Sequence, residues 1–280
     1  MAAKTHLWRR NWASALSMAQ GVINSNEYAL TANFGSIFTQ AGENNRESIF
    51  EIQASIGANG ADNFFSWHAI AQGVRGSGDW DLGWGWNSPT ESFVNAWSDD
   101  DPRKRHSVLF SGQADGSFGR VLPEFPAIPR KFWNKKVYPE PSMQTFTGER
   151  QGGWVNQRVL RYADVLLMAA EAANEIGGAA NQTLAVNYLE MIRARARGGN
   201  SAILPKIEFA NQTQMRAAIQ AERRVELAFE GDNFFDLVRW GRAQDVLGSA
   251  GYTNRHRFYP IPQQAIDNSG GKLVQNPEWN

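Results

Sequence analysis

Residues 221–241 read AERRVELAFEGDNFFDLVRWG, and this stretch decides the fold. Apolar residues recur at helical spacing from Met215 to Phe229, which predicts an amphipathic helix. Gly231 is expected to end this helix, because glycine enters the left-handed conformation at a helix C-terminus without steric cost. Asp232 is then expected to cap a second short helix that carries the Phe-Phe pair and the apolar residues after it.

The same stretch holds a set of acids and arginines. Glu222 and Glu226 lie one turn apart and share a helix face, with Glu230 one turn further on. Two carboxylates at a sugar site could carry out acid–base or nucleophilic catalysis. The arginines nearby in the sequence are Arg223, Arg224 and Arg239. Because buried charges need partners, we predict instead a structural network of ion pairs that joins the two helices.

Three further stretches follow the order found in one known family. They are RYADVLLMAAEAANE at 161–175, AVNYLEMIRARA at 185–196, and YPIP at 259–262 with QNP at 275–277. Together with 221–241, they resemble the C-terminal portion of the SusD/RagB family, surface glycan-binding lipoproteins of Bacteroidetes-type bacteria. The resemblance implies a mostly α fold, with tetratricopeptide-type helix pairs and a large irregular loop insertion.

Composition excludes several classes of protein. The chain has 280 residues with 28 Lys and Arg against 28 Asp and Glu, so it lacks the basic excess that holds nucleic acid. It has no cysteine, and its histidines do not lie at metal-ligand spacing. The sequence also lacks the phosphate-binding, zinc-protease and serine-hydrolase motifs. We therefore predict no cofactor, no metal site and no catalytic residue.

The chain is expected to have three parts. Residues 1–56 hold a residual tetratricopeptide-type helix over 7–25 and an extended segment over 48–55. Residues 57–157 form a loop-rich region facing the ligand, with one short helix over 89–97. Residues 158–280 form the helical region that resembles the family, with helices over 159–176 and 182–197 and an extended tail whose prolines interrupt any helix.

The N-terminus departs from the family pattern. Residues 1–8 have no apolar core of a signal peptide, and the lipidated cysteine of the family is missing. We expect an N-terminally truncated chain whose lipid anchor is absent.

The loop region is rich in tryptophan. Five of the chain's 11 tryptophans fall between 67 and 97, and residues 76–87 read GSGDWDLGWGWN. Tryptophan flanked by glycine suits the display of flat rings to sugars better than the building of a core. The predicted ligand-binding residues are Trp84, Trp86, Trp80 and Trp67, with polar partners Asp79, Asp81 and Asn87, and further polar candidates Asn63 and His68. Two or three of the five tryptophans are instead expected to attach the loops to the body, Trp97 among them.

The resemblance implies a function without catalysis. Family members capture oligosaccharides at the cell outer membrane and pass them to a SusC-like TonB-dependent transporter. Three alternatives remain open: a RagB-like protein that takes up peptide, a tetratricopeptide-type scaffold for other proteins, and a glycoside hydrolase using Asp79 and Asp81.

Overall fold

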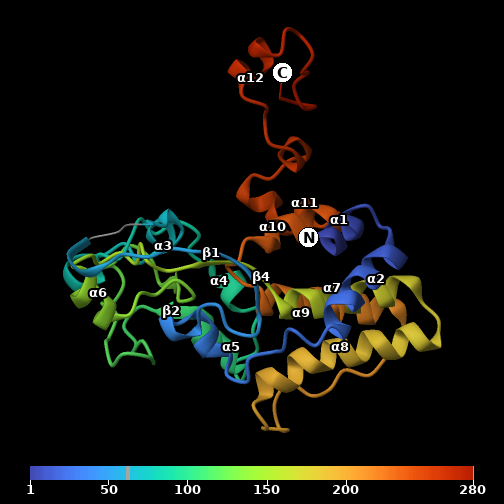
Figure 1. Cartoon of the computed structure of the whole chain (residues 1–280), viewed down its shortest axis with the longest axis horizontal. Helices are drawn as coiled ribbons and strands as arrows, with labels where there is room; N and C mark the ends of the chain where they lie inside the picture. The colour runs from blue at the N-terminus through green and yellow to red at the C-terminus, as the bar shows by residue number, and fades with distance from the viewer. Residues whose placement is uncertain (61–63, 280) are drawn as a thin grey trace. The chain divides into compact units, whose positions relative to one another are not determined.

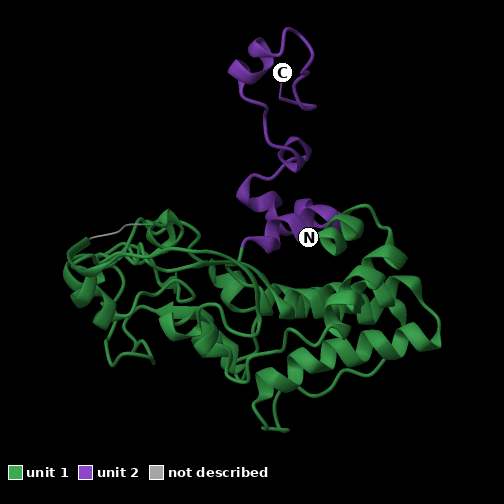
Figure 2. Ribbon diagram, viewed as in Figure 1, with its two compact units in different colours: residues 1–230 green, residues 231–280 purple. Residues whose placement is uncertain are grey.

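The computed structural model describes residues 1–60 and 64–279, and it is mostly α-helical as predicted. The chain divides into two compact units, residues 1–230 and 231–280 (Figure 2). The helices are α1 Ala2–Trp8, α2 Trp12–Asn24, α3 Trp67–Gln72, α4 Glu91–Val94, α5 Pro102–Ser107, α6 Pro141–Thr147, α7 Tyr162–Ile176, α8 Ala179–Arg197, α9 Gln212–Glu226, α10 Asp232–Arg239, α11 Ala243–Leu247 and α12 Gln263–Asn268. The strands are β1 Ser48–Ile52, β2 Val108–Phe110, β3 Phe132–Asn134 and β4 Gln157–Arg161.

Helix α7 is the centre of unit 1. Helices α2, α8 and α9 all pack against it (Figure 1). Every α7 side chain from Tyr162 to Asn174 is buried, including a series of alanines that let neighbouring helices approach closely. The nearly all-apolar sequence of this segment therefore gave the correct prediction of a buried helix.

The predicted helix over 7–25 is two helices. The chain breaks after α1 at Arg10, which has a φ of 55°, and α2 starts at Trp12. Asn11 caps α2, since its Oδ1 accepts a hydrogen bond from Ser14 N at 3.4 Å. Asparagine favours this capping position, and that preference overrides the apolar pattern that runs across the break.

The predicted helix over 159–176 begins later than expected. Residues 157–161 form β4, which pairs antiparallel with β1, and the helix begins at Tyr162. The strand at 48–52 agrees with the predicted extended segment. In β4, Arg158 pairs with Glu51 on β1 and Arg161 pairs with Glu47 just before it. This long-range pairing overrides the local helical period of the sequence.

The loop region has a small core of its own. Strands β2 and β3 pair antiparallel within it, and a cluster of buried side chains surrounds them. The cluster consists of Val74, Trp80, Leu82, Leu109, Leu122, Ile128, Trp133 and Tyr138. The predicted boundaries at 57 and 158 both fall inside unit 1. The predicted helix over 89–97 is α4, capped by the Thr90 hydroxyl.

Helix α9 ends earlier than its sequence suggests. It stops at Glu226, and residues 227–230 form a turn in which Phe229 has a φ of 67°. Gly231, with a φ of 97°, then precedes α10 as its N-cap. The glycine therefore serves the start of the second helix, where Asp232 had been expected to act as the cap.

Unit 2 ties its two tail segments together. Gln275 accepts a hydrogen bond from Ile261 N at 2.8 Å and donates one to Ile261 O at 2.9 Å. Asn276 donates to Tyr259 O at 2.6 Å. The stretches YPIP and QNP thus hold each other. Helix α12 interrupts the predicted extended tail. It begins directly after Pro262, and proline is well tolerated at the start of a helix.

Candidate functional site

Helix α3 and the loop that follows it carry the exposed tryptophans. Ser66 Oγ accepts a hydrogen bond from His68 N at 3.3 Å, so Trp67 is the first residue of the helix. Gly73 ends the helix. The chain later returns, as residues 82–86, over the C-terminal end of the same helix.

Backbone hydrogen bonds fix this return. Trp84 N donates to Ile70 O at 2.9 Å, and Trp86 N donates to Ala71 O at 2.8 Å. Gly85 N donates to Gly73 O at 3.0 Å. The last carbonyls of a helix have no partner within it. The loop satisfies them, and in doing so it sets the positions of both tryptophans relative to α3.

Two glycines allow the backbones to approach so closely. A Cβ at Gly83, whose φ is 158°, would lie 2.1 Å from Ile70 O. A Cβ at Gly73 would lie 2.0 Å from Leu82 O. Both distances are far below van der Waals contact. Gly73 at the end of α3 and Gly83 before Trp84 are therefore required by the close approach of the loop to α3.

Four aromatic side chains lie beside one another on this surface, and we call them the aromatic row: Phe65, Trp67, Trp84 and Trp86. The distances between successive ring centroids are 5.1, 5.5 and 5.0 Å. Their exposed fractions are 39%, 60%, 41% and 63% in the same order. A group of large exposed apolar rings in contact with one another is typical of a binding surface.

The prediction that Trp80 faces a ligand is wrong, because this side chain is buried. Only 7% of it is exposed, because its ring stacks on Tyr138 at 5.7 Å and Arg120 covers it at 5.0 Å. Trp97 is buried against Phe229, which confirms its predicted place in the core. Two of the five loop tryptophans are therefore structural.

The predicted polar partners lie in two places. Asp79 and Asp81 are exposed on either side of buried Trp80, and Asp79 Oδ2 lies 3.6 Å from Arg120. Asn87 directly follows the row, and its Nδ2 donates to Gln72 Oε1 at 2.6 Å. Asn63 lies outside the described residues.

His68 is mostly buried next to the row. Gln72 Nε2 lies 3.2 Å from both ring nitrogens of His68. Burial, reinforced by the charge of Arg158, lowers the pKa of His68 to about 4. The ring is therefore neutral at neutral pH, where it serves as a hydrogen-bond partner and not as a charged ligand contact.

Sequence reasoning missed Phe65. The residue belongs to the row because its ring lies on Gly153, where a Cβ would be 2.4 Å away. Ser66 N also donates to Gly153 O at 2.8 Å. The local signal was a Phe-Phe pair directly before the Ser66 cap, but the glycine that seats the ring is far away in the sequence.

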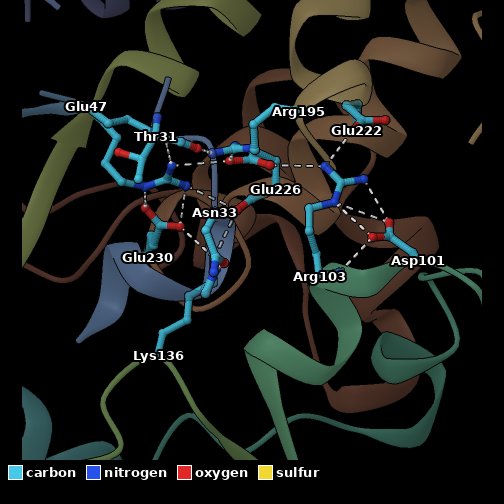
Figure 3. Close-up of polar contacts among 12 residues, drawn as sticks. Thr31, Asn33, Glu47, Asp101, Arg103, Lys136, Arg195, Glu222, Glu226 and Glu230 are labelled. Carbon is cyan, nitrogen blue, oxygen red and sulfur yellow. Dashed lines mark hydrogen bonds and ion pairs between the residues drawn. The ribbon is translucent and has the colours of Figure 1, made fainter. Parts of the chain in front are cut away.

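The acids of α9, Glu222 and Glu226, are buried and belong to a second cluster of polar side chains (Figure 3). Glu226 lies 2.5 Å from Arg195 Nη2, 3.0 Å from Arg103 and 3.2 Å from Arg161. Glu222 contacts Arg103 and Arg193 at 2.5 and 2.8 Å. The acids are thus saturated with cations, as a structural network requires.

The partners of these acids differ from those predicted. They come from α5, α8 and the last residue of β4, and Lys136 adds an ion pair to Glu230 at 2.6 Å. The predicted arginines have other contacts. Arg223 bonds Asp164 at 2.7 Å, Arg224 lies over the Phe93 ring, and Arg239 bonds Asp236 at 2.8 Å. When the charged residues of a network come from distant segments, one stretch of sequence cannot predict which arginine pairs with which acid.

Electrostatics in this cluster act differently on its acid Glu226 and its base Lys136. Burial alone would raise the pKa of Glu226, but Arg195, Arg161 and Arg103 outweigh it and hold that pKa well below its usual range. Burial lowers the pKa of Lys136 to about 8, although Glu230 acts in the opposite direction. Glu226 therefore stays ionised in ion pairs, the opposite of what a proton-donating acid needs.

Other candidate sites are weak. Across residues 1–60 and 64–279, no three His, Cys, Asp or Glu side chains are grouped so as to hold a metal ion. Within the same ranges, no helix is long and apolar enough to cross a membrane. Unit 2 has an aromatic pocket of about 380 Å³, lined in part by Phe234, Tyr252 and Trp279, which contains none of the predicted site residues.

Known proteins with a similar sequence belong to one family. The model for the SusD family matches residues 46–256. SusD-like protein P25 of Formosa agariphila is 27% identical over 94% of this chain and 54% of its own length. SusD-like protein P2 of the same organism is 28% identical over 99% of this chain and 58% of its own length. The chain thus spans somewhat more than half the length of these curated relatives.

Solved structures have the same fold. Surface glycan-binding protein A from Bacteroides thetaiotaomicron superposes with a TM-score of 0.76 at 23% identity, covering 98% of this chain and 62% of that one. A laminarin-binding SusD-like protein gives a TM-score of 0.76 at 27% identity, covering 99% of this chain and 61% of that one. At 23% identity, the likeness to surface glycan-binding protein A shows a shared fold and nothing further.

Proposed function

This chain belongs to the SusD family, and from that premise we propose that its aromatic row binds an oligosaccharide without cleaving it. The observation that carries the proposal is the contact among Trp67, Trp84 and Trp86 on an exposed surface. Sugar rings have apolar C–H faces that stack on indole, and ring-edge hydroxyls take hydrogen bonds from polar groups nearby. The Oδ1 atom of Asn87 is the proposed polar contact nearest the row in sequence.

The relatives support a glycan as the ligand. One neighbour of the same fold was solved in complex with laminarihexaose, and another is described as laminarin-binding. By family likeness, we propose that the chain acts at the cell outer membrane. Its proposed partner is a SusC-like TonB-dependent transporter that receives the glycan.

The positions of the candidate catalytic carboxylates favour binding of the sugar over its hydrolysis. Glu222 and Glu226 are buried in ion pairs, and Asp79 and Asp81 lie beside a buried tryptophan instead of within the row. An uptake protein needs only reversible capture, for which a row of aromatic rings suffices.

Affinity electrophoresis against a panel of polysaccharides tests the proposal, with isothermal titration of the oligosaccharide that retards the parent protein. Trp84→Ala and Trp86→Ala are compared with Trp8→Ala, a matched control because Trp8 is 42% exposed on α1, outside the row. Loss of one stacking ring costs about 2 kcal/mol, or about 30-fold in affinity. We expect this loss in the row variants and parent-like binding in the control.

Three outcomes contradict the proposal. Equal retardation of the row variants and the control would place the sugar elsewhere. Binding of a peptide library with no retardation by any glycan would favour the peptide-uptake alternative. Release of reducing sugar during incubation with the retarding glycan would show a hydrolase.

A further inference from the structure

The buried side-chain amide of Gln72 links helix α3, which carries Trp67, to the loop that carries Trp84 and Trp86. Gln72 is the last residue of α3, only 8% exposed. Its Oε1 accepts hydrogen bonds from Asn87 Nδ2 at 2.6 Å and from Asn134 Nδ2 at 3.0 Å. Its Nε2 lies against the His68 ring and donates to His68 O at 3.2 Å. The amide thus contacts α3, the loop after Trp86, and strand β3.

The orientation of this amide is fixed. Two donors converge on its oxygen, so a flipped amide would place an NH₂ group against Asn87 and Asn134. Asn134 is itself held, because its Oδ1 accepts a hydrogen bond from Lys136 N at 2.9 Å. Satisfied buried networks of this kind give one conformation. Asn87 therefore meets an acceptor that cannot turn away.

The loop needs such an anchor after Trp86. Its backbone hydrogen bonds to α3 end at Trp86 N, and Asn87 has a φ of 55°, where the chain leaves the helix. The bond from Asn87 to Gln72 is the side-chain link between α3 and the loop at this point, among the residues that the structure describes. Trp67 is at the other end of the same helix.

We propose that Gln72 is a positioning residue for the aromatic row, which holds Trp84 and Trp86 at a fixed angle to Trp67 before any ligand arrives. This rests on the proposed function of the row. A surface that is ordered in advance loses less conformational entropy on binding, and it therefore binds more tightly with the same contacts. Gln72 raises affinity in this way without touching the ligand.

The test uses two variants and a matched control. Asn87→Gly removes the link to Gln72 while keeping a residue that accepts the positive φ. Asn26→Gly is the control, because Asn26 has a φ of 57° and its side chain bonds the nearby Asn24 O, far from the row in sequence. Gln72→Leu removes the whole network in a side chain of similar size.

Two readouts are measured on each protein. The first is exciton coupling between Trp84 and Trp86 in circular dichroism without ligand, with Trp86→Phe identifying the signal of the pair. The second is the dissociation constant of the oligosaccharide found to bind the parent protein. We expect Asn87→Gly to weaken the couplet and to lower affinity about fivefold, the value of one hydrogen bond. Gln72→Leu should lower affinity about tenfold or more, and Asn26→Gly should match the parent in both readouts.

The outcomes separate this proposal from the proposed function. An unchanged ligand-free couplet in Asn87→Gly would overturn the positioning role of Gln72, and a loss of affinity beside it would report only the proposed contact of Asn87 with the sugar. If no glycan binds the parent, the proposed function fails, and the ligand-free couplet still decides whether Gln72 orders the row. If Gln72→Leu does not fold, the ligand-free couplet of Asn87→Gly decides the matter, since Asn87 is exposed and its own proposed contact with the sugar does not enter that readout.

Discussion

Arg195 Nη2 on α8 lies 2.5 Å from Glu226 Oε1 on α9, and both side chains are removed from water. The same carboxylate also contacts Arg161, at the point where β4 passes into α7. Taking these charges out of water costs several kcal/mol for each ion, and only the paired geometry compensates for that cost. The cluster therefore makes the packing of α7, α8 and α9 dependent on every member being present.

Replacement of Glu226 by alanine should destabilise the protein strongly. The variant leaves Arg103, Arg161 and Arg195 buried with too few carboxylates, and breaking a buried pair in this way costs about 3–5 kcal/mol. Urea unfolding followed by far-ultraviolet circular dichroism measures the change in midpoint.

Glu208→Ala is the matched control for this prediction. Glu208 pairs with Lys206 at 3.0 Å, but its side chain is exposed, so its loss should cost less than about 1 kcal/mol. If the two variants unfold at the same urea concentration, the cluster does not stabilise the fold.

The sequence was most informative where local chemistry determines structure. The apolar run of α7 and the order of the four stretches that resemble the SusD/RagB family predicted the mostly helical fold correctly. Strand β4 was missed because its partner β1 lies about a hundred residues earlier, as the pair Ile52 and Gln157 shows. Local periodicity cannot report a pairing of that kind.

The candidate site shows the same limit. Trp80 and Trp84 occur in similar Gly- and Asp-rich sequence, yet one is buried and the other exposed. The difference comes from Tyr138, a distant residue that stacks on Trp80. Phe65 likewise joins the row because of Gly153. Composition predicted an aromatic surface, whereas long-range contacts decide which rings form it.

Asp164 should make the protein sensitive to acid between pH 4 and 2. Burial alone would raise the pKa of Asp164, but Arg223 and Lys4, at 2.7 and 3.1 Å, outweigh it and lower the pKa to about 2. A carboxyl whose pKa is depressed by folding contributes stability above its unfolded pKa, and that contribution is lost as pH falls through the folded value. A shift of this size corresponds to about 2 kcal/mol.

The measurement compares the parent with Asp164→Asn in urea at pH 5, 3.5 and 2. The difference in unfolding free energy should be largest at pH 5 and should shrink towards pH 2, where Asp164 is about half protonated in the folded protein. Other carboxyl groups titrate in both proteins and cancel in the difference. A difference that stays constant with pH would contradict the ion-pair explanation.

Gly83→Ala should displace the loop that carries Trp84. The new Cβ would lie 2.1 Å from Ile70 O, so the hydrogen bond from Trp84 N to that carbonyl cannot survive unchanged. We expect binding of the oligosaccharide to fall at least as much as in Trp84→Ala, about 30-fold. Gly78→Ala is the control, because Gly78 also has a positive φ, of 58°, but open space around its Cβ position. Equal affinity of the two variants would show that the close approach to α3 does not set the row.

His68 should make stability fall between pH 6.5 and 4. Burial, followed by the charge of Arg158, lowers the pKa of His68 to about 4, and Glu230 offsets this only in part. As pH falls from 6.5, the unfolded chain takes up the proton first. Proton binding stabilises the unfolded state relative to the folded state, so the free energy of unfolding decreases. We expect a loss of about 3 kcal/mol over this range.

The variant His68→Gln tests this prediction, because glutamine does not titrate and still offers a carbonyl oxygen to the Gln72 amide. Unfolding free energies of the parent and the variant should converge as pH falls from 6.5 to 4, and the difference should be constant from pH 7 to 8, where His68 is neutral in both states. Parallel curves from pH 7 to 4 would mean that the folded protein protonates His68 as readily as the unfolded chain does. In that case the Gln72 network would have to admit a charged ring beside the aromatic row, and oligosaccharide affinity would change near pH 6.5 instead of remaining constant down to about pH 4.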